Sequence, residues 1–241
     1  MDYSSAEIAG IYDVVNPWSE DLDFYLSLAP ATGTCDVLDL GCGTGTLCSA
    51  FARRGHRVTG VDPAAAMLAI ARSKPQAEQI EWVESSAQCY RSQRRFDLIV
   101  MTGHVFQTFL FDADALAALG SMRDHLKPNG KVAFETRNPP HNWVKEWTTR
   151  PPVPRTLRGQ QFNERLEIES HKDEFISFRT SYDFPHTTLT TSSTLRFPSR
   201  EHVEALIAQS GLSVREVFGD WDASPFDFAT SREIIFIATL A

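Results

Sequence analysis

Ten residues near the start of the chain decide its fold class: Asp36-Val37-Leu38-Asp39-Leu40-Gly41-Cys42-Gly43-Thr44-Gly45. A short apolar run carries one acid and ends in three glycines at alternate positions, and residues 46–52 after it are typical of a helix. Glycines let the backbone turn tightly and approach a ligand closely, and the following helix presents its first amides to that ligand. The stretch therefore predicts a parallel βαβ unit with a ligand at its turn.

Alternating strands and helices continue on both sides of this unit. Two helical pieces are expected within residues 6–29, and further helices at 64–73 and 112–125. Apolar runs predict four more strands, at 57–62, 79–84, 95–101 and 131–136. The alternation indicates an α/β fold with a mixed, mostly parallel sheet and helices on both faces.

The alternation stops after the fifth strand. Residues 138–198 are rich in Pro, Thr, Ser and aromatic residues, and they show period-two stretches instead of helical spacing. They predict an antiparallel β insertion of two or three hairpins. The expected division is an α/β core at 1–137, the strand-rich insertion at 138–198 and a C-terminal part of the core at 199–241.

The α/β pattern returns at Ser199, which is placed to cap a helix that Gly211 closes. Strands are expected at 212–218 and 234–240. Because the link between them shows no helical pattern, we expect the two strands to form an antiparallel hairpin at the sheet edge.

Composition limits the class of partner. The chain has 241 residues, of which 42% are hydrophobic, and a net charge of −8, which suits one domain with a small inserted piece. The acidic balance opposes binding to nucleic acid or to an anionic membrane, and no apolar run reaches the ~18 residues of a membrane helix. Residues 1–5 lack the basic and apolar regions of a signal peptide, so a cytoplasmic protein is expected.

The four cysteines are Cys35, Cys42, Cys48 and Cys89. They show neither CxxC spacing nor a histidine partner at the spacing of a zinc site. We therefore expect reduced thiols and no metal site.

Two ligand classes compete for the glycine turn. A dinucleotide fingerprint needs a third glycine where this chain has Thr46, and an acid about 20 residues further on, where Asp62 stands. Both classes use Asp62, because a carboxylate at the end of the second strand can accept both hydroxyls of a ribose. Asp39 separates the classes, because its carboxylate would repel a pyrophosphate and pair with an ammonium group. The residues favour a ligand with an ammonium group and a ribose over NAD(P), and an oxidoreductase remains the less favoured alternative.

The order of motifs resembles that of class I S-adenosylmethionine (SAM)-dependent methyltransferases. The matching segments are 37–45, 58–62, 82–87, 96–100 and 126–131. The resemblance spans roughly residues 35–137 and, more loosely, 199–240. It implies a Rossmann-like fold, SAM as the cofactor and methyl transfer as the activity. The chain departs from the family at Ser86, where an acid often binds the adenine amino group.

This resemblance implies a set of cofactor contacts. Asp39 is expected to bind the methionine amino group, directly or through water, and Asp62 the ribose. The backbone amides of Gly41, Cys42 and Gly43 are expected to shape the methionine pocket. The full expected set is Tyr12, Asp39, Gly41, Cys42, Gly43, Gly45, Asp62, Pro63, Met67, Ser86, Ala87, Gln88 and Met101.

The expected acceptor is a small molecule that is methylated on nitrogen or oxygen. His104, in the loop after the fourth strand, is a possible general base; alternatively it caps the next short helix or lines the cofactor pocket. Tyr12 and Trp18 either close over the cofactor or pack as ordinary aromatic residues. The expected substrate contacts are Trp18, Gln107, Arg137 and His141.

The insertion has three open interpretations. It covers the substrate side of the crevice, forms a dimer interface, or is a structural extension, so a monomer and a homodimer are both expected. Its aromatic residues include Trp143, Trp147, Phe175, Phe178 and Tyr182. A SAM-binding protein without catalysis remains an alternative to the enzyme.

Overall fold

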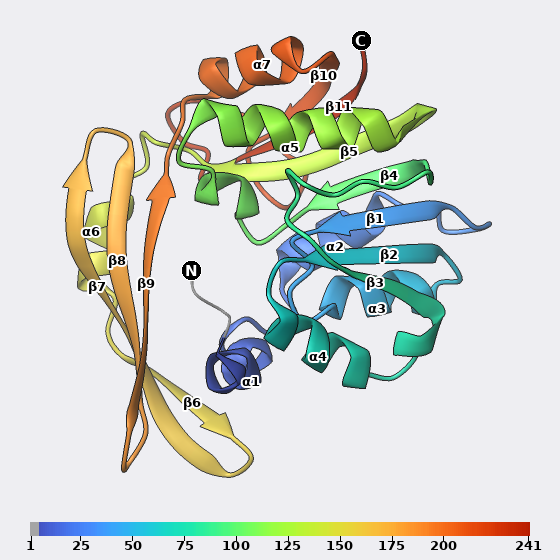
Figure 1. Cartoon of the computed structure of the whole chain (residues 1–241). Helices are drawn as coiled ribbons and strands as arrows, with labels where there is room; N and C mark the ends of the chain where they lie inside the picture. Colours follow the sequence, from blue (N-terminus) through green and yellow to red (C-terminus); the bar gives the residue numbers. More distant parts are fainter. Residues whose placement is uncertain (1–4) are drawn as a thin grey trace.

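A seven-stranded sheet with helices on both faces and a separate four-stranded sheet beside it make up the computed structural model (Figure 1). The model describes residues 5–241. The expectation that the chain lacks a signal peptide rests largely on residues 1–4, which lie outside the described residues.

The large sheet has the strand order β10-β11-β5-β4-β1-β2-β3. Its parallel strands are β1 (Asp36–Leu40), β2 (Arg57–Asp62), β3 (Ile80–Glu84), β4 (Phe96–Met101) and β5 (Leu126–Arg137). The last strand, β11 (Glu233–Leu240), pairs antiparallel with β5, and β10 (Leu212–Phe218) pairs antiparallel with β11. The mixed sheet and its antiparallel hairpin are confirmed.

Helices cover both faces because the strands are apolar on both sides. On one face, Val132 and Phe134 of β5 pack with α5 (Asp112–His125) and α7 (Arg200–Gln209). On the other face, Ala133 packs in a second cluster with α2 (Glu20–Ser27) and α3 (Thr46–Arg53). The remaining helical elements are α1 (Ala6–Val15), α4 (Ala65–Ser73), η1 (Ala77–Gln79) and η2 (Val105–Thr108).

The predicted start of the fifth strand at 131 is wrong, because β5 begins directly after α5, at Leu126. Residues 127–130, which the sequence presents as a turn, lie within this strand. Phe96 of β4 pairs with Leu126 of β5, whereas Leu98, only two residues further along β4, pairs with Lys131. Residues 127–130 therefore form a bulge within β5.

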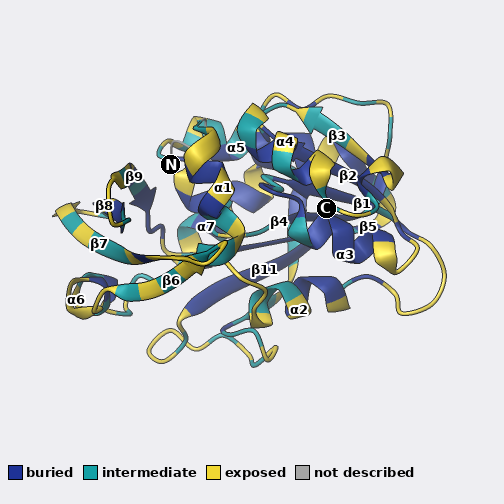
Figure 2. Cartoon of the chain, turned by 90° about the horizontal axis from the view of Figure 1, so that it is seen from below, coloured by how far each residue is buried: buried dark blue, intermediate teal, exposed yellow. Residues whose placement is uncertain are grey.

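The insertion forms its own antiparallel sheet, as predicted. Its strands are β6 (Val153–Leu157), β7 (Gln160–Lys172), β8 (Phe175–Asp183) and β9 (Thr188–Arg196). Exposed positions are frequent along β6 and β7, whereas β1, β2, β4, β5 and β11 of the large sheet are mostly buried (Figure 2).

The expectation that this insertion lacks helices is wrong. Helix α6 (Trp143–Thr149) precedes β6, and the Asn142 side chain caps it by accepting the Lys145 amide hydrogen at 3.0 Å. Trp147 packs on Phe178 of β8 and on Phe197, with ring centroids 5.2 and 5.9 Å apart. Burial of its tryptophans against the sheet stabilises a helix that is too short to form alone.

Among residues 5–241, no helix is long and apolar enough to cross a membrane.

Candidate active site

The glycine turn is fixed to the end of β2 by its own amides. The amides of Gly41 and Cys42 both donate to the Val61 carbonyl, at 2.7 and 3.0 Å. The Gly43 amide donates to Asp62 Oδ2 at 2.8 Å. These three amides thus hold the turn in place, and the expectation that they shape the methionine pocket stays a prediction.

Neighbours lie on two sides of this turn, and one of them leaves no room for a side chain at Gly41. Gly41 has a φ of +80°, and a Cβ there would lie 2.7 Å from Cγ2 of Val105, at the start of η2. Across Gly43, a Cβ would lie 3.7 Å from the Tyr12 ring of α1. The turn therefore lies between α1 and the loop after β4, and Tyr12 covers it.

Asp39 lies near the end of β1, directly before this turn, and its side chain is buried, with only 1% of the residue exposed. Its Oδ2 accepts the Cys48 thiol hydrogen at 3.2 Å, while its Oδ1 has no hydrogen-bond partner among residues 5–241. Burial raises the pKa of Asp39 to about 7. A buried carboxylate with a free oxygen is costly unless a cation or donor binds it, so Asp39 fits the ammonium group of SAM.

Asp62 stands at the end of the adjacent strand. Its Oδ1 accepts the Ala64 amide hydrogen and its Oδ2 that of Gly43, both at 2.8 Å. Each carboxylate oxygen can accept a second hydrogen bond, so both oxygens can also bind a ribose hydroxyl. Burial, and then the charge of Asp62, raises the pKa of Tyr12 to about 12. The residues at this turn fit an ammonium group and a ribose.

The other expected cofactor residues lie directly after β2, on α4, after β3 and on β4. Pro63 is exposed directly after Asp62, and Met67 is buried on α4. Ser86, Ala87 and Gln88 lie in the turn after β3, where the Ser86 carbonyl accepts the amide hydrogens of Cys89 and Tyr90. Met101 is fully buried in the same cluster as Ala87. Their contacts with the cofactor stay predictions.

A polar cluster that the sequence analysis missed joins α1 to the glycine turn. Lys74 Nζ lies 2.7 Å from Asp13 Oδ2 of α1 and donates to the hydroxyls of Thr44 and Thr46 at 3.0 and 2.8 Å. The Thr44 hydroxyl also donates to Asp13. Thr44 lies 31 residues after Asp13 and 30 residues before Lys74, so no local sequence pattern signals these contacts.

A second missed cluster lies at the carboxyl ends of β4 and β5 and the start of β11. His104 has a φ of +60°, and its amide donates to Oε1 of the buried Glu135. Its Nε2 lies 2.9 Å from Glu233 Oε2, and its Nδ1 lies 3.9 Å from Glu135 Oε1. Tyr25 of α2 also donates to Glu135. His104 precedes η2 without a side-chain capping bond, and its role as a base stays a prediction.

Two of the four expected substrate residues hold each other. Arg137 donates to the Gln107 Oε1 at 2.9 Å, and its guanidinium stacks on Trp143 and Trp147. Gln107 is fully buried, and its Nε2 donates to the Arg196 carbonyl at the end of β9. Gln107 therefore braces Arg137 against the insertion, and the substrate contacts of both residues stay predictions.

The other two lie further out. His141 Nε2 pairs with Glu146 Oε2 at 2.8 Å, beside Arg232. Trp18 lies in the link between α1 and α2, is 38% exposed and donates from Nε1 to Asp23. Their contacts with a substrate stay predictions.

The aromatic residues of the insertion are mostly internal. Trp143, Trp147 and Phe178 are buried between α6 and the second sheet. Tyr182 is buried with Ile8 and Ile11 of α1. They hold α6 and α1 to one face of the second sheet instead of lining a surface.

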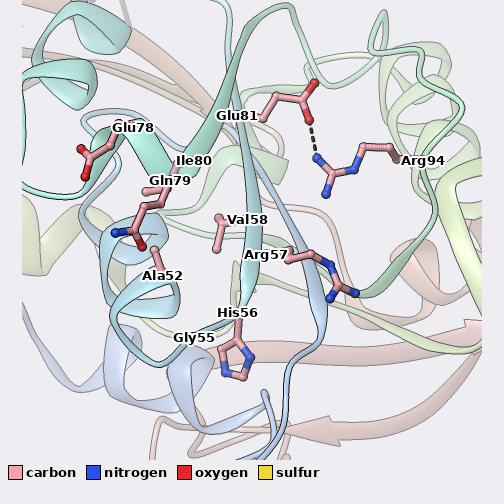
Figure 3. Close-up of a pocket in the computed structure, with 10 residues that line it drawn as sticks. All are labelled: Ala52, Gly55, His56, Arg57, Val58, Glu78, Gln79, Ile80, Glu81 and Arg94. Carbon is pink, nitrogen blue, oxygen red and sulfur yellow. Dashed lines mark hydrogen bonds and ion pairs between the residues drawn. The ribbon is translucent and has the colours of Figure 1, made fainter.

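A cavity of about 560 Å³ lies at the opposite edge of the large sheet (Figure 3). It opens where β2 and β3 begin, near His56, Arg57 and Ile80, whereas Asp62 marks the other end of β2. Arg94 pairs with Glu81 across it. Its position separates it from the chemistry of the glycine turn.

Solved structures first define the fold. A SAM-dependent methyltransferase from Clostridium acetobutylicum superposes with a TM-score of 0.76 over 98% of both chains, at 16% identity. A SAM-bound amino pentose methyltransferase from Micromonospora echinaspora superposes with a TM-score of 0.65, over 96% of this chain and 97% of that one, at 21% identity. The fold is the Rossmann-like methyltransferase fold.

Sequence comparison then identifies a domain within the chain. Residues 37–130 match the family model described as a methyltransferase domain. A ubiquinone biosynthesis O-methyltransferase of Rhodopseudomonas palustris is 30% identical over 109 residues, which cover 44% of this chain and 41% of that protein. The match spans less than half the length of these curated relatives. By sequence, residues 37–130 resemble a methyltransferase domain, and the whole chain has the fold of SAM-dependent methyltransferases.

Proposed function

We propose that this chain transfers a methyl group from SAM to a nitrogen or oxygen of a small polar molecule, in the cytoplasm. The observation that carries the proposal is the buried Asp39 carboxylate, whose Oδ1 has no partner within residues 5–241, beside a glycine turn that Asp62 holds. The family match covers residues 37–130, the cofactor half of the chain. It therefore supports the identity of the cofactor more directly than the identity of the acceptor.

The residues of the turn have separate tasks in this proposal. Asp39 holds the ammonium group, Asp62 holds the ribose, and Tyr12 covers the turn from α1. SAM, when bound, supplies the methyl group and a neutral thioether leaving group. The protein contributes mainly by aligning the acceptor and excluding water, and alignment alone is worth up to about 7–11 kcal/mol.

The insertion supplies the acceptor side of the site. Thr180 pairs with Thr191, and Ser193 pairs with Phe178, on the face of the second sheet that packs against α6 and α1. All three hydroxyl-bearing residues are buried, and Ser193 Oγ has no partner among the described residues. These hydroxyls lie between the α6 cluster and the α1 cluster. A polar acceptor suits such a surface, and the solved neighbour that acts on an amino pentose supports a sugar-like one.

Helix α1 serves as the lid in this proposal. Ile8 and Ile11 pack on Phe162 and Tyr182 of the second sheet, while Asp13 on the same helix pairs with Lys74. Figure 1 shows α1 between the two sheets. In this proposal the α/β core binds the cofactor, the insertion binds the acceptor, and the C-terminal part forms the edge of the large sheet.

Replacing Asp62 with alanine tests the cofactor assignment. The loss of two hydrogen bonds to a charged acceptor is expected to weaken SAM binding by about 1–3 kcal/mol, measured by calorimetric titration. Asp124→Ala is the matched control, because Asp124 is exposed on α5. Equal SAM affinity in both variants, with unchanged denaturation midpoints, would reject the ribose assignment.

A SAM-binding protein without catalysis is the second candidate. Calorimetry cannot separate it from the enzyme, so turnover is needed. Transfer of radiolabelled methyl to at least one amine, phenol or sugar acceptor supports the enzyme. SAM binding without transfer to any acceptor supports the second candidate.

A further inference from the structure

Two buried glutamates face one imidazole at the acceptor side of the site. Glu135 is 1% exposed and Glu233 is 6% exposed, and both contact His104. They come from neighbouring strands, since β5 and β11 pair with Glu233 opposite Arg137. The cofactor contacts described above use neither carboxylate.

Arg137 lies opposite Glu233 and its charge acts on that carboxyl, but the two form no ion pair. Within residues 5–241, no lysine or arginine forms an ion pair with Glu135 or Glu233, and His104 is the only basic partner of either. The Arg137 guanidinium donates to Gln107 and stacks on the rings of Trp143 and Trp147. Arg232 is directed to Glu146, at 2.9 and 3.0 Å. Buried carboxylates without a cation attract one.

The surrounding charges set the protonation of the pair. Burial raises the pKa of Glu233 to about 8, which Arg137 and Arg232 oppose and Asp220 and Asp21 reinforce. Burial, and then Arg137, lowers the pKa of His104. At pH 7 the shared proton therefore resides on the Glu233 carboxyl, and the imidazole is neutral.

We propose that Glu233 and Glu135 form a subsite for an ammonium group, and that the methyl acceptor is an amine whose proton passes to Glu233. This inference rests on the proposed methyl transfer and extends it to the acceptor. His104 is a positioning residue, because it holds Glu233 at 2.9 Å through Nε2. Its side chain is 18% exposed, which makes this cluster open on one side.

The proton and electron balance is complete without another reactant. An ammonium group binds, the Glu233 proton leaves to solvent, and the resulting carboxylate then takes one proton from the ammonium. The freed nitrogen lone pair forms the bond to the methyl carbon, while the methyl–sulfur bond breaks and its electrons stay on sulfur. The positive charge moves from sulfur to nitrogen, so the product leaves as a methylated ammonium ion.

Matched acceptor pairs test this inference with the full chain. The pairs are cyclohexylamine with cyclohexanol, benzylamine with benzyl alcohol, and glucosamine with glucose. Methyl transfer to at least one of the amines, and to none of the alcohols, is expected. Glu233→Gln is expected to lower kcat/KM for that amine about 100-fold at pH 8, the usual effect of losing a general base. Glu167→Gln, at an exposed glutamate on β7, is the control.

The pH profile distinguishes this role from a structural one. In the unaltered protein kcat/KM is expected to rise as pH passes about 8, where Glu233 loses its proton. In Glu233→Gln this limb is expected to disappear, with unchanged SAM affinity. Calorimetry on the complex with S-adenosylhomocysteine gives a readout without turnover, because benzylamine binding at pH 7 should release close to one proton and benzyl alcohol none. This readout also applies if Glu233→Gln fails to fold.

Three results would overturn the inference: transfer to alcohols alone, no transfer to any of the three amines, or benzylamine binding without proton release. Transfer to alcohols alone, or benzylamine binding without proton release, leaves the proposed methyl transfer standing. SAM binding without transfer to any acceptor supports the SAM-binding protein without catalysis. Absence of SAM binding by the unaltered protein instead contradicts the proposed function itself.

Discussion

Replacing Gly45 with alanine is expected to destabilise the protein by about 2–5 kcal/mol and to weaken SAM binding. Gly45 has a φ of +71°, where an L side chain costs about 1–2 kcal/mol. A Cβ there would lie 2.3 Å from Cη2 of Trp82 and 3.2 Å from Cβ of Ala71. Overpacking of this kind adds about 1–3 kcal/mol.

The effect on binding follows from the position of Gly45 in the turn. Its amide donates to the Cys42 carbonyl at 2.9 Å, and α3 begins at the next residue. Trp82 cannot retreat freely, because its ring also lies against Gly60, where a Cβ would be 2.6 Å away, and its Nε1 donates to the Ala77 carbonyl. The turn must therefore shift, and Asp39 and Asp62 no longer face the cofactor together.

Gly55→Ala is the matched control. Gly55 has a similar φ of +83°, but no atom lies within 4 Å of a Cβ placed there. The free energy of unfolding of this variant is expected to fall only by the cost of the left-handed backbone, about 1–2 kcal/mol. Its affinity for SAM is expected to equal that of the unaltered protein. Chemical denaturation and calorimetric titration of both variants measure the difference. Equal stability and equal affinity would show that close packing at Gly45 is unimportant.

The glycine turn and the two acids beside it could be predicted because their signals are local. The acid at Asp39, the glycines and the acid at Asp62 lie within 24 residues, and each strand ends at the same edge of the sheet. The antiparallel hairpin at the edge was predictable for a similar reason, since the link between β10 and β11 has no helix.

The acceptor half depends on contacts between distant residues. Glu233 lies 129 residues from His104, and Glu135 lies 31 residues from it. One signal was available: Glu135 and Arg137 are polar residues on one face at the carboxyl end of an apolar strand, the edge where ligands bind in such sheets. The sequence alone could not show that β11 places Glu233 beside them.

Helix α6 was missed because its stability comes from packing. It has seven residues between the proline pairs 139–140 and 151–152, and tryptophan, valine and threonine are moderate helix formers. Asn142 in the capping position and the spacing of Trp143 and Trp147 were the available signals. Those tryptophans also stack with the Arg137 guanidinium, which lies opposite Glu233 without forming an ion pair with it.

SAM binding is expected to strengthen about tenfold per pH unit as pH rises towards 7, because Asp39 must lose a proton to pair with an ammonium group. In the free protein burial raises the pKa of Asp39 to about 7, above its ordinary value of 3.8. The folded protein therefore binds more protons than the unfolded chain between these values, so its stability falls as pH rises through this window. An ammonium partner lowers the pKa, and binding then releases one proton.

Asp39→Asn isolates this effect, since it keeps the shape of the side chain and removes its charge. The groups that face Asp39 are the Cys48 thiol on α3 and the Asp62 carboxylate on β2, and both remain in the variant. At pH 7 the variant is expected to bind SAM more weakly by about 1.5–3 kcal/mol, the value of a hydrogen bond to a charged group. Calorimetry between pH 5 and 7, in two buffers of different ionisation enthalpy, measures affinity and proton release together. If both proteins show the same pH slope and release the same number of protons, Asp39 does not hold the ammonium group, and the cofactor must be oriented by other residues of the turn.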